Sequence, residues 1–213
     1  MSNITDPITA TLNRLEAMAD PASTPGVQKP TPKFATAYTP LEFPLNFQLT
    51  DAITRNAYQA VQLWINDITH NFTERARTLI LHGRPGAGKS HLLHETVRTL
   101  REHRRKVVSK NAINCADILR EGNTHTLEQF WAPAAIFCLD DFGSEYHTEW
   151  LTTQWFSLFD QRINKWTFIT TNLSPAQIEA RYDSRIASRL FSTRNTIVDL
   201  SQAADFRKKL SYL

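Results

Sequence analysis

Residues 78–93, TLILHGRPGAGKSHLL, contain the most informative pattern of the sequence. The first five of these residues, 78–82, form an apolar run that predicts a buried strand, and residues 89–104 carry apolar side chains at helical spacing. Between them, GRPGAGKS fits the pattern G-x-x-x-x-G-K-[ST]. A strand before this pattern and a helix after it are the context that the pattern requires. The stretch therefore predicts a loop that binds the phosphates of a nucleotide.

Each residue type in this loop has a chemical reason. Gly86 and Gly88 allow backbone N–H groups to approach phosphate oxygens without a Cβ in the way, and the following helix adds its positive N-terminal end. Lys89 reaches the β- and γ-phosphates, and the Ser90 hydroxyl binds Mg²⁺. The predicted cofactors are therefore ATP and Mg²⁺. The predicted cofactor-binding residues are Gly83, Arg84, Pro85, Gly86, Ala87, Gly88, Lys89, Ser90 and His91.

A pair of acids, Asp140 and Asp141, follows the apolar run AAIFCL. A strand over 134–140 would bring the Asp140 carboxylate beside the phosphate-binding loop, where it would hold Mg²⁺ through water. Asp141 would then orient and deprotonate the attacking water. The alternative is that two adjacent acids only cap the end of a strand.

Two further polar signals follow. Asn172 ends the apolar strand 167–171, and if this strand lies between the two described above, its amide points at the γ-phosphate and positions the water. Asn also ends many strands without a catalytic role. Arg185 and Arg189 are four residues apart and share one helical face. Such a pair forms either a solvated surface or arginine fingers that reach the γ-phosphate of a neighbouring subunit.

Strands and helices alternate along the chain. Unbroken apolar strands between helices predict a parallel sheet that is covered on both faces. The five expected strands cover 78–82, 106–112, 134–140, 167–171 and 196–200. The expected helices include one capped by Asp51, one that begins at Cys115, one over 148–163 and a short one opened by Ser174 and Pro175. In the helix over 148–163, the residues expected to face inward are Trp150, Leu151, Trp155, Leu158 and Phe159.

Two segments precede this α/β domain, which is expected over residues 46–213. Residues 1–20 predict an amphipathic helix, and six prolines within residues 21–45 exclude regular structure and predict an extended linker. The helix either folds back onto its own domain or docks in a groove of another protein. A tether of this kind favours docking. The apolar face of the helix contains Ile8, Leu12, Leu15 and Ala19.

The composition and the absence of some sequence signals indicate which general class of protein to expect. A hydrophobic fraction of 41% and a charged fraction of 21% are typical of a globular protein in water. The net charge of +3 permits a polyanionic partner without requiring one. Cys115 and Cys138 form no C-x-x-C pair, which argues against a zinc site. Neither a signal peptide nor a run of ~18 apolar residues is found, so we expect a cytoplasmic protein.

These motifs, in this order, resemble those of AAA+ ATPases and, more narrowly, those of the DnaC/DnaI-type replicative helicase loaders, with IstB and DnaA as relatives. The resemblance covers residues from about 45 to 210, in GRPGAGKSHLL, AIFCLDDFG, FITTNL, SRIASRLF and DFRKK. It implies a three-layer P-loop fold with a five-stranded parallel sheet in the order 5-1-4-3-2. It also implies that Lys89 and Ser90 are Walker A residues, that Asp140 and Asp141 are Walker B residues, and that Asn172 is sensor 1. Arg189 would be the arginine finger acting in trans, with Arg185 beside it, and Arg207 a sensor 2-like arginine.

The function implied by this resemblance is ATP-dependent loading of a replicative helicase onto single-stranded DNA during replication initiation. The N-terminal helix would bind the hexameric helicase, and copies of the chain would assemble through Arg189. The alternative is an IstB-like ATPase that assists a transposase in selecting target DNA. Lys106 and Lys110, close to REHRR, suit contact with single-stranded DNA, but a basic helix end also complements the helix dipole.

Some features separate the candidate classes. Asp141 stands where the DnaC branch usually has Glu, whereas IstB and DnaA tolerate Asp. Only 13 residues follow Leu200, so no C-terminal helical lid domain is expected, which favours DnaC or IstB over DnaA. A small-molecule P-loop kinase would not need Asn172 together with the arginine pair. A non-hydrolysing adaptor would not need both aspartates.

Overall fold

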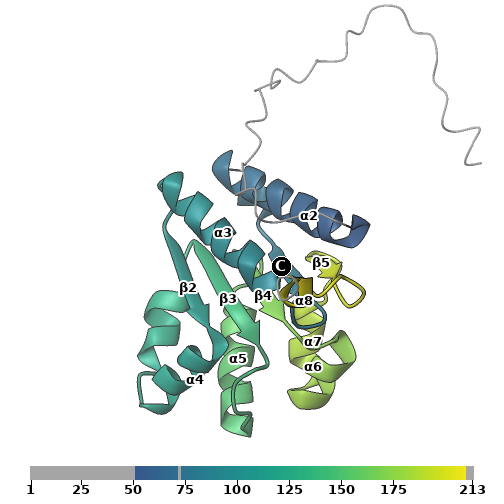
Figure 1. Cartoon of the computed structure of the whole chain (residues 1–213). Helices are drawn as coiled ribbons and strands as arrows, with labels where there is room; N and C mark the ends of the chain where they lie inside the picture. The colour runs from purple at the N-terminus through teal and green to yellow at the C-terminus, as the bar shows by residue number, and fades with distance from the viewer. Residues whose placement is uncertain (1–50, 72, 210–213) are drawn as a thin grey trace, which may run out of the picture. The chain divides into compact units, whose positions relative to one another are not determined.

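The computed structural model describes residues 51–71 and 73–209. The expected N-terminal helix over 1–20 and the linker over 21–45 lie outside these ranges. Within them, five parallel strands form one sheet in the order β2-β3-β4-β1-β5, as the resemblance implied (Figure 1). The strands are β1 (Thr78–His82), β2 (Val107–Asn111), β3 (Ile136–Phe142), β4 (Trp166–Thr171) and β5 (Thr196–Asp199).

Helices cover both faces of this sheet, which makes three layers. One face packs against α2 (Ala52–Thr69) and α3 (Lys89–Glu102). The other face packs against α4 (Ala112–Arg120), the short π-helix η2 (Leu127–Trp131), α5 (Glu149–Gln161), α6 (Pro175–Arg181) and α7 (Ser184–Leu190). Two short elements complete the described chain, the 3-10 helix η1 (Thr73–Arg75) and α8 (Phe206–Lys209). In this part of the chain, no helix has both the length and the apolar character needed to cross a bilayer.

The strands are buried on both faces because successive side chains point to opposite layers. In β3, Ile136 and Cys138 belong to the core under α2 and α3, whereas Phe137 and Leu139 belong to the core under α5. Full burial of an apolar side chain of this size contributes about 1.5–3 kcal/mol. This two-sided burial explains why the strands appear in the sequence as unbroken apolar runs.

The expected helix caps are present at two helix starts. The Asp51 carboxylate accepts a hydrogen bond from the backbone N–H of Thr54 at 2.7 Å, which begins α2. Ser174 and Gln177 form a reciprocal capping box at the start of α6. Each such cap stabilises its helix by about 1 kcal/mol.

Two expectations about helices are wrong. Helix α4 begins at Ala112 rather than Cys115, because the Asn111 side chain accepts a hydrogen bond from the backbone N–H of Ile113 at 2.9 Å and caps the helix. Trp150 does not face inward but is 42% exposed. Thr148 caps α5, and its buried positions continue from Leu151 at helical spacing, so Trp150 falls one position off the buried stripe.

Strand β3 begins and ends two residues later than the sequence predicted and contains both acids. The expected strand ends at Asp140, but β3 continues to Phe142, with a shift in its register against β4 between Leu139 and Phe142. Asp141 lies within this irregularity with φ at 57°. The left-handed conformation costs about 1 kcal/mol for a non-glycine residue, although Asp tolerates it better than most. The irregularity places Asp141 and Asp140 in different surroundings.

Candidate nucleotide-binding site

The loop between β1 and α3 lies at the end of the sheet where β1, β3 and β4 finish. The backbone N–H of Gly83 donates to the carbonyl of Thr171 at 3.2 Å, which ties the start of the loop to the end of β4. Gly86 and Gly88 have φ values of 82° and 85°, in the left-handed region that glycine adopts without strain. The glycine spacing of the motif therefore fits the path of the backbone.

A segment far along the chain packs directly against this loop. A Cβ added to Gly83 would lie 2.4 Å from the carbonyl carbon of Leu200, and one added to Gly86 would lie 2.0 Å from Oδ1 of Asp205. The backbone N–H of Phe206 donates to the Gly86 carbonyl at 3.0 Å. These glycines are therefore needed for close approach to the segment after β5 as well as for backbone conformation.

Lys89 is the first residue of α3, and its ammonium group is enclosed by the loop. Lys89 is 6% exposed, and its Nζ donates to the carbonyls of Gly83 at 2.8 Å and Arg84 at 2.9 Å. A third bond runs from Nζ to Oδ1 of Asn172 at 2.8 Å. Burial lowers the pKa of Lys89 to about 8, against the opposing effect of the Asp141 and Asp140 carboxylates. The lysine is thus saturated by neutral oxygens that a phosphate could replace.

Asn172 connects this lysine to the second acid. Its Nδ2 donates to Oδ1 of Asp141 at 2.8 Å, while its Oδ1 accepts from Lys89. Strand β4 lies between β1 and β3, which is the placement on which the role expected for Asn172 depends. The pKa of Asp141 is raised, first by burial and then by the neighbouring Asp140 carboxylate. A carboxylate with a raised pKa is a better proton acceptor near neutral pH.

Asp140 lies behind this group and is only 8% exposed. The Thr170 hydroxyl donates to Oδ1 of Asp140 at 2.6 Å and accepts from the backbone N–H of Asp141 at 2.8 Å. Nε2 of His94 lies 3.5 Å from Oδ2 of Asp140. Thr170 thus links the two acids, although no pattern within FITTNL distinguishes it from its neighbours.

Lys89, Asn172 and Asp141 line a cavity of about 450 Å³ beside the loop. Most of its lining was expected from the sequence, and Arg207 enters it from the segment after β5. Phe206 was not expected, and its only sequence signal is its position next to Arg207. The lining residues are Pro85, Gly86, Gly88, Lys89, Ser90, His91, Asp141, Asn172, Phe206 and Arg207.

The other expected residues lie outside this lining. Gly83, Arg84 and Ala87 belong to the loop but do not line the cavity, and the carbonyls of Gly83 and Arg84 accept hydrogen bonds from Lys89. Asp140 is buried and does not line the cavity either. Arg185 and Arg189 lie on α7 and do not reach the nucleotide cavity of their own chain. This arrangement fits either of the two interpretations that the sequence left open, a surface pair or a pair that acts on another subunit.

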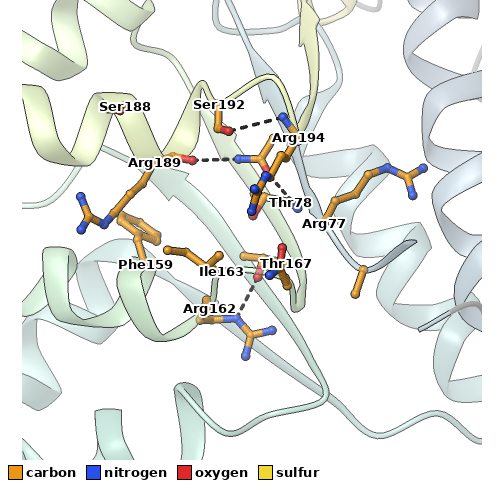
Figure 2. Close-up of a pocket in the computed structure, with 13 residues that line it drawn as sticks. Arg77, Thr78, Phe159, Arg162, Ile163, Thr167, Ser188, Arg189, Ser192 and Arg194 are labelled. Atoms are coloured by element: carbon orange, nitrogen blue, oxygen red, sulfur yellow. Dashed lines mark hydrogen bonds between the residues drawn. The ribbon is translucent and has the colours of Figure 1, made fainter. Parts of the chain in front are cut away.

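A second cavity, of about 200 Å³, lies at the opposite end of the sheet, where β1 and β4 begin (Figure 2). Arg77, Arg162 and Arg189 line it, but their guanidinium groups point in different directions and do not converge on a common centre. Arg162 is 2% exposed and donates to the carbonyls of Trp131 and Ala134, among other oxygens. Arg162 therefore supports the surrounding backbone.

Comparisons with known proteins find similar folds among solved structures. No family model matches the chain, and neither does any curated protein sequence. Among solved structures, the crystal structure of the DnaC helicase loader is similar with a TM-score of 0.57 and 23% identity, over 70% of this chain and 91% of that one. DnaI has a TM-score of 0.62 and 18% identity, over 76% of this chain and 88% of that one.

The AMPPCP-bound DnaA from Aquifex aeolicus is similar with a TM-score of 0.59 and 17% identity, over 77% of this chain. The matched region spans 53% of that DnaA structure, so this chain corresponds to about half its length. At these identities the likeness concerns the fold. The chain has an α/β fold, with a phosphate-binding-loop motif between β1 and α3, that is similar to the folds of the DnaC, DnaI and DnaA structures.

Proposed function

We propose that this chain is a P-loop ATPase that loads a replicative DNA helicase onto single-stranded DNA. The observation that carries the ATPase proposal is the chain of hydrogen bonds from Lys89 through Asn172 to Asp141 at one cavity. Lys89 begins α3, Asn172 directly follows β4, and Asp141 lies in β3, so these residues meet because β4 lies between β1 and β3. An isolated glycine-rich turn would not need this arrangement.

The loop residues would bind the phosphates of ATP. Phosphate oxygens would accept hydrogen bonds from backbone N–H groups between Gly86 and Ser90 and benefit from the positive end of α3. Lys89 would exchange its bond with Asn172 for a bond to the γ-phosphate. Arg207, which lines the same cavity, would contact the phosphates from within the same chain.

Asp141 would act on the attacking water. Release from Lys89 would leave Asn172 bonded to Asp141, so that the amide and the carboxylate could orient one water molecule between them. The raised pKa of Asp141 favours proton transfer from this water to the carboxylate. Asp141 is therefore proposed as the general base and Asn172 as the residue that positions the water.

The residues expected to hold Mg²⁺ fit that ion. The Ser90 hydroxyl lines the cavity, and Asp140 supplies a buried carboxylate beneath it. The described residues contain no group of three or more His, Cys, Asp and Glu side chains that could hold a metal ion by itself. Mg²⁺ usually takes few protein ligands and shares the substrate phosphates and water. The bound ion would neutralise phosphate charge, and Thr170 would orient Asp140 toward it.

Hydrolysis is proposed to need two copies of the chain. Arg189 and Arg185 lie on α7, outside the cavity of their own chain. In an assembly, Arg189 would reach the γ-phosphate bound to a neighbouring copy, with Arg185 beside it. An arginine in this position stabilises the charge that develops on the transferred phosphoryl group.

Exposed aromatic residues after β3 support binding of single-stranded DNA. Tyr146 is 78% exposed and Trp150 is 42% exposed, and the Arg120 guanidinium lies 5.9 Å from the centre of the Tyr146 ring. Aromatic faces beside basic groups bind single strands by stacking, worth about 1–3 kcal/mol per base. We expect Tyr146→Ala to weaken binding of a single-stranded oligonucleotide, as measured by fluorescence anisotropy.

The partner is proposed to bind the N-terminal helix over residues 1–20, which lies outside the described residues. A loading assay on circular single-stranded DNA tests the whole proposal, because a closed helicase ring can enter a circle only if it is opened. The full chain with ATP should increase the amount of hexameric helicase on the circle, and Lys89→Ala should not. The same loading without ATP, or no loading at all, would contradict the proposal. Specific binding to a transposase instead would favour the IstB-like alternative.

A further inference from the structure

Two arginines of α7 lie against one partly buried aromatic ring of α5. The guanidinium carbon of Arg189 lies 4.1 Å from the centre of the Phe156 ring, and that of Arg185 lies 4.7 Å from it. Both are within the range of a cation–π contact. Two positive groups are thus brought to the same side chain of α5.

Carboxylates offset this concentration of positive charge. Asp160 accepts from Nε of Arg189 at 2.9 Å and from its Nη2 at 2.7 Å, both at Oδ1. Asp183 accepts from Nε and Nη2 of Arg185 at 3.0 Å and 2.7 Å. Each arginine therefore has one acidic partner and one aromatic contact.

The two arginines differ in how firmly they are placed. Arg189 has a side-chain exposure of 27%, against 64% for Arg185. Arg189 also donates from Nη1 to the carbonyl of Arg185 at 3.2 Å. Its partner Asp160 comes from another helix, whereas Asp183 is only two residues from Arg185. Arg189 is thus fixed against α5 as well as against its own helix.

The supports of Arg189 leave part of its guanidinium group available. Of five N–H donors in a guanidinium, one on each of Nε, Nη2 and Nη1 is used by Asp160 and the Arg185 carbonyl. One N–H on each terminal nitrogen is left without a hydrogen-bond partner among residues 51–71 and 73–209. Two such donors on adjacent nitrogens suit bidentate binding of a phosphate. In Figure 2 the guanidinium group of Arg189 points away from the other labelled arginines that line the cavity.

Phe156 and Asp160, which contact Arg189, lie on a helix that is packed into the core. Phe156 and Asp160 are four residues apart on α5 and so share one face of the helix. Their sequence neighbours Trp155 and Phe159 are buried in the core, and so are Ile186 and Leu190, which directly follow the two arginines on α7. The position of the ring and the carboxylate relative to Arg189 is thus set by packed helices rather than by a loop.

We infer that Phe156 and Asp160 are positioning residues that hold Arg189 ready for a phosphate bound to a second copy of the chain. This inference rests on the proposed function, because it assigns a support to the arginine finger proposed there. A long arginine side chain that is already fixed loses less conformational entropy when it binds the phosphate. Neither Phe156 nor Asp160 would touch the nucleotide, so their effect would act through Arg189 alone.

The test separates the arginine of one subunit from the nucleotide cavity of the other. One subunit carries Arg189→Ala, so that it has an intact cavity and no finger. The second carries Lys89→Ala, so that only its finger can contribute, and receives in addition Phe156→Leu, Phe156→Tyr, Asp160→Asn or Glu149→Gln. Glu149 is an exposed acid on the same helix as Asp160, and it serves as the charge-matched control. Thermal unfolding of each variant checks that the fold is intact.

We expect Phe156→Leu and Asp160→Asn to lower the kcat of the mixture about tenfold relative to Lys89→Ala alone, with the KM for ATP unchanged. Phe156→Tyr keeps the ring and should retain the reference rate, as should Glu149→Gln. If the rates were retained in both Phe156→Leu and Asp160→Asn, the inference would be overturned, but the role proposed for Arg189 as an arginine finger would stand. A reference mixture with no activity, or full activity when the second subunit also carries Arg189→Ala, would overturn the proposed finger and this inference with it.

A second readout needs no hydrolysis. In a chain with Asp141→Asn, which should retain ATP, a phosphate contact from Arg189 would stabilise ATP-dependent self-association. Phe156→Leu in that chain should raise the protein concentration needed for assembly in sedimentation velocity, and Phe156→Tyr should not. Equal assembly of the Phe156→Leu chain and its parent would count against the inference.

Discussion

Lys89 and Asn172 are joined by a hydrogen bond of 2.8 Å between Nζ and Oδ1, which links the phosphate-binding loop to the end of β4. The amide of Asn172 is joined in turn to Asp141. A phosphate oxygen that replaced the Asn172 oxygen at Lys89 would change the neighbours of all three residues together. Occupancy of the cavity would therefore be transmitted to the acid that is proposed to activate water.

Lys89→Ala should weaken ATP binding by tenfold or more, about 1.4 kcal/mol. The substitution removes the positive charge that would face the γ-phosphate, and it leaves Asn172 without its donor. Isothermal calorimetry of the variant measures the loss, and Lys110→Ala on β2, outside the cavity, is the control lysine. Equal affinity in Lys89→Ala and the parent chain would contradict the assignment of the phosphate-binding loop.

ATP affinity should fall as the pH rises through about 8. The pKa of Lys89 is lowered to about 8, so the free protein has a charged lysine below this pH and loses the charge above it. Binding of phosphate favours the charged form, and protonation before binding becomes increasingly costly as the pH rises. The dissociation constant should increase about tenfold between pH 7 and pH 9. In Lys89→Ala this increase should disappear; a variant with the same pH dependence would assign the effect to another group.

Asp141→Asn should bind ATP and hydrolyse it at least ~10²-fold more slowly. The amide keeps the shape of the side chain and can still accept from Asn172, but it cannot accept a proton from water. Steady-state phosphate release gives the rate, and calorimetry confirms that the nucleotide binds. Asp117→Asn, a change at an exposed acid on α4, should leave the rate unchanged. An unchanged rate in Asp141→Asn would show that another group is the base.

Gly83→Ala should destabilise the fold far more than Gly122→Ala. Both glycines have positive φ, at 136° and 86°, so both substitutions strain the backbone. The added Cβ at Gly83 would lie 2.4 Å from the backbone of Leu200, whereas nothing lies within 4 Å of the one at Gly122. Urea unfolding should give a difference of about 2 kcal/mol or more between the variants. Similar stabilities would mean that the contact with Leu200 relaxes without cost.

Deletion of residues 1–20 should abolish co-purification with a hexameric helicase and leave the thermal stability and ATP affinity of the rest nearly unchanged. Leu12→Asp or Leu15→Asp should have the same effect, because a charge on the apolar face would oppose burial in a groove. Burial of each leucine is worth roughly 1.5–3 kcal/mol, against the cost of ordering the segment. If the deletion unfolds or aggregates the protein, the helix belongs to the domain core instead.

The sequence predicted the sheet well because its strands are buried on both faces. The run TLILH is polar only at its two ends, and the threonines of TFITT are buried together with its apolar residues. The position of Asn172 beside Lys89 followed from one condition, that β4 lies between β1 and β3, and the strand order meets it.

Other features depend on contacts that no local pattern contains. The irregularity in β3 that turns Asp141 out of line with Asp140 is supported by Thr170, which lies on another strand. Phe206 reaches the cavity because its backbone bonds to Gly86, far away in the sequence. The error at Trp150 arose because an apolar residue was assigned to the buried face, although it lies about 100° around the helix from its neighbour Leu151.

The position of β1 between β4 and β5 has a consequence for synthesis of the protein. The backbone N–H of Thr78 bonds to Asn195, 117 residues later, and the loop after β1 leans on Leu200 and Asp205. When β1 and α3 have left the ribosome during synthesis, the phosphate-binding motif is complete, but the segment that packs against it, which contains Leu200 and Asp205, has not yet been made. Contacts of such separation form late and slowly. The nascent chain would thus gain affinity for nucleotide only after β5 and the segment that follows it have emerged, and ATP would select finished molecules over incomplete ones.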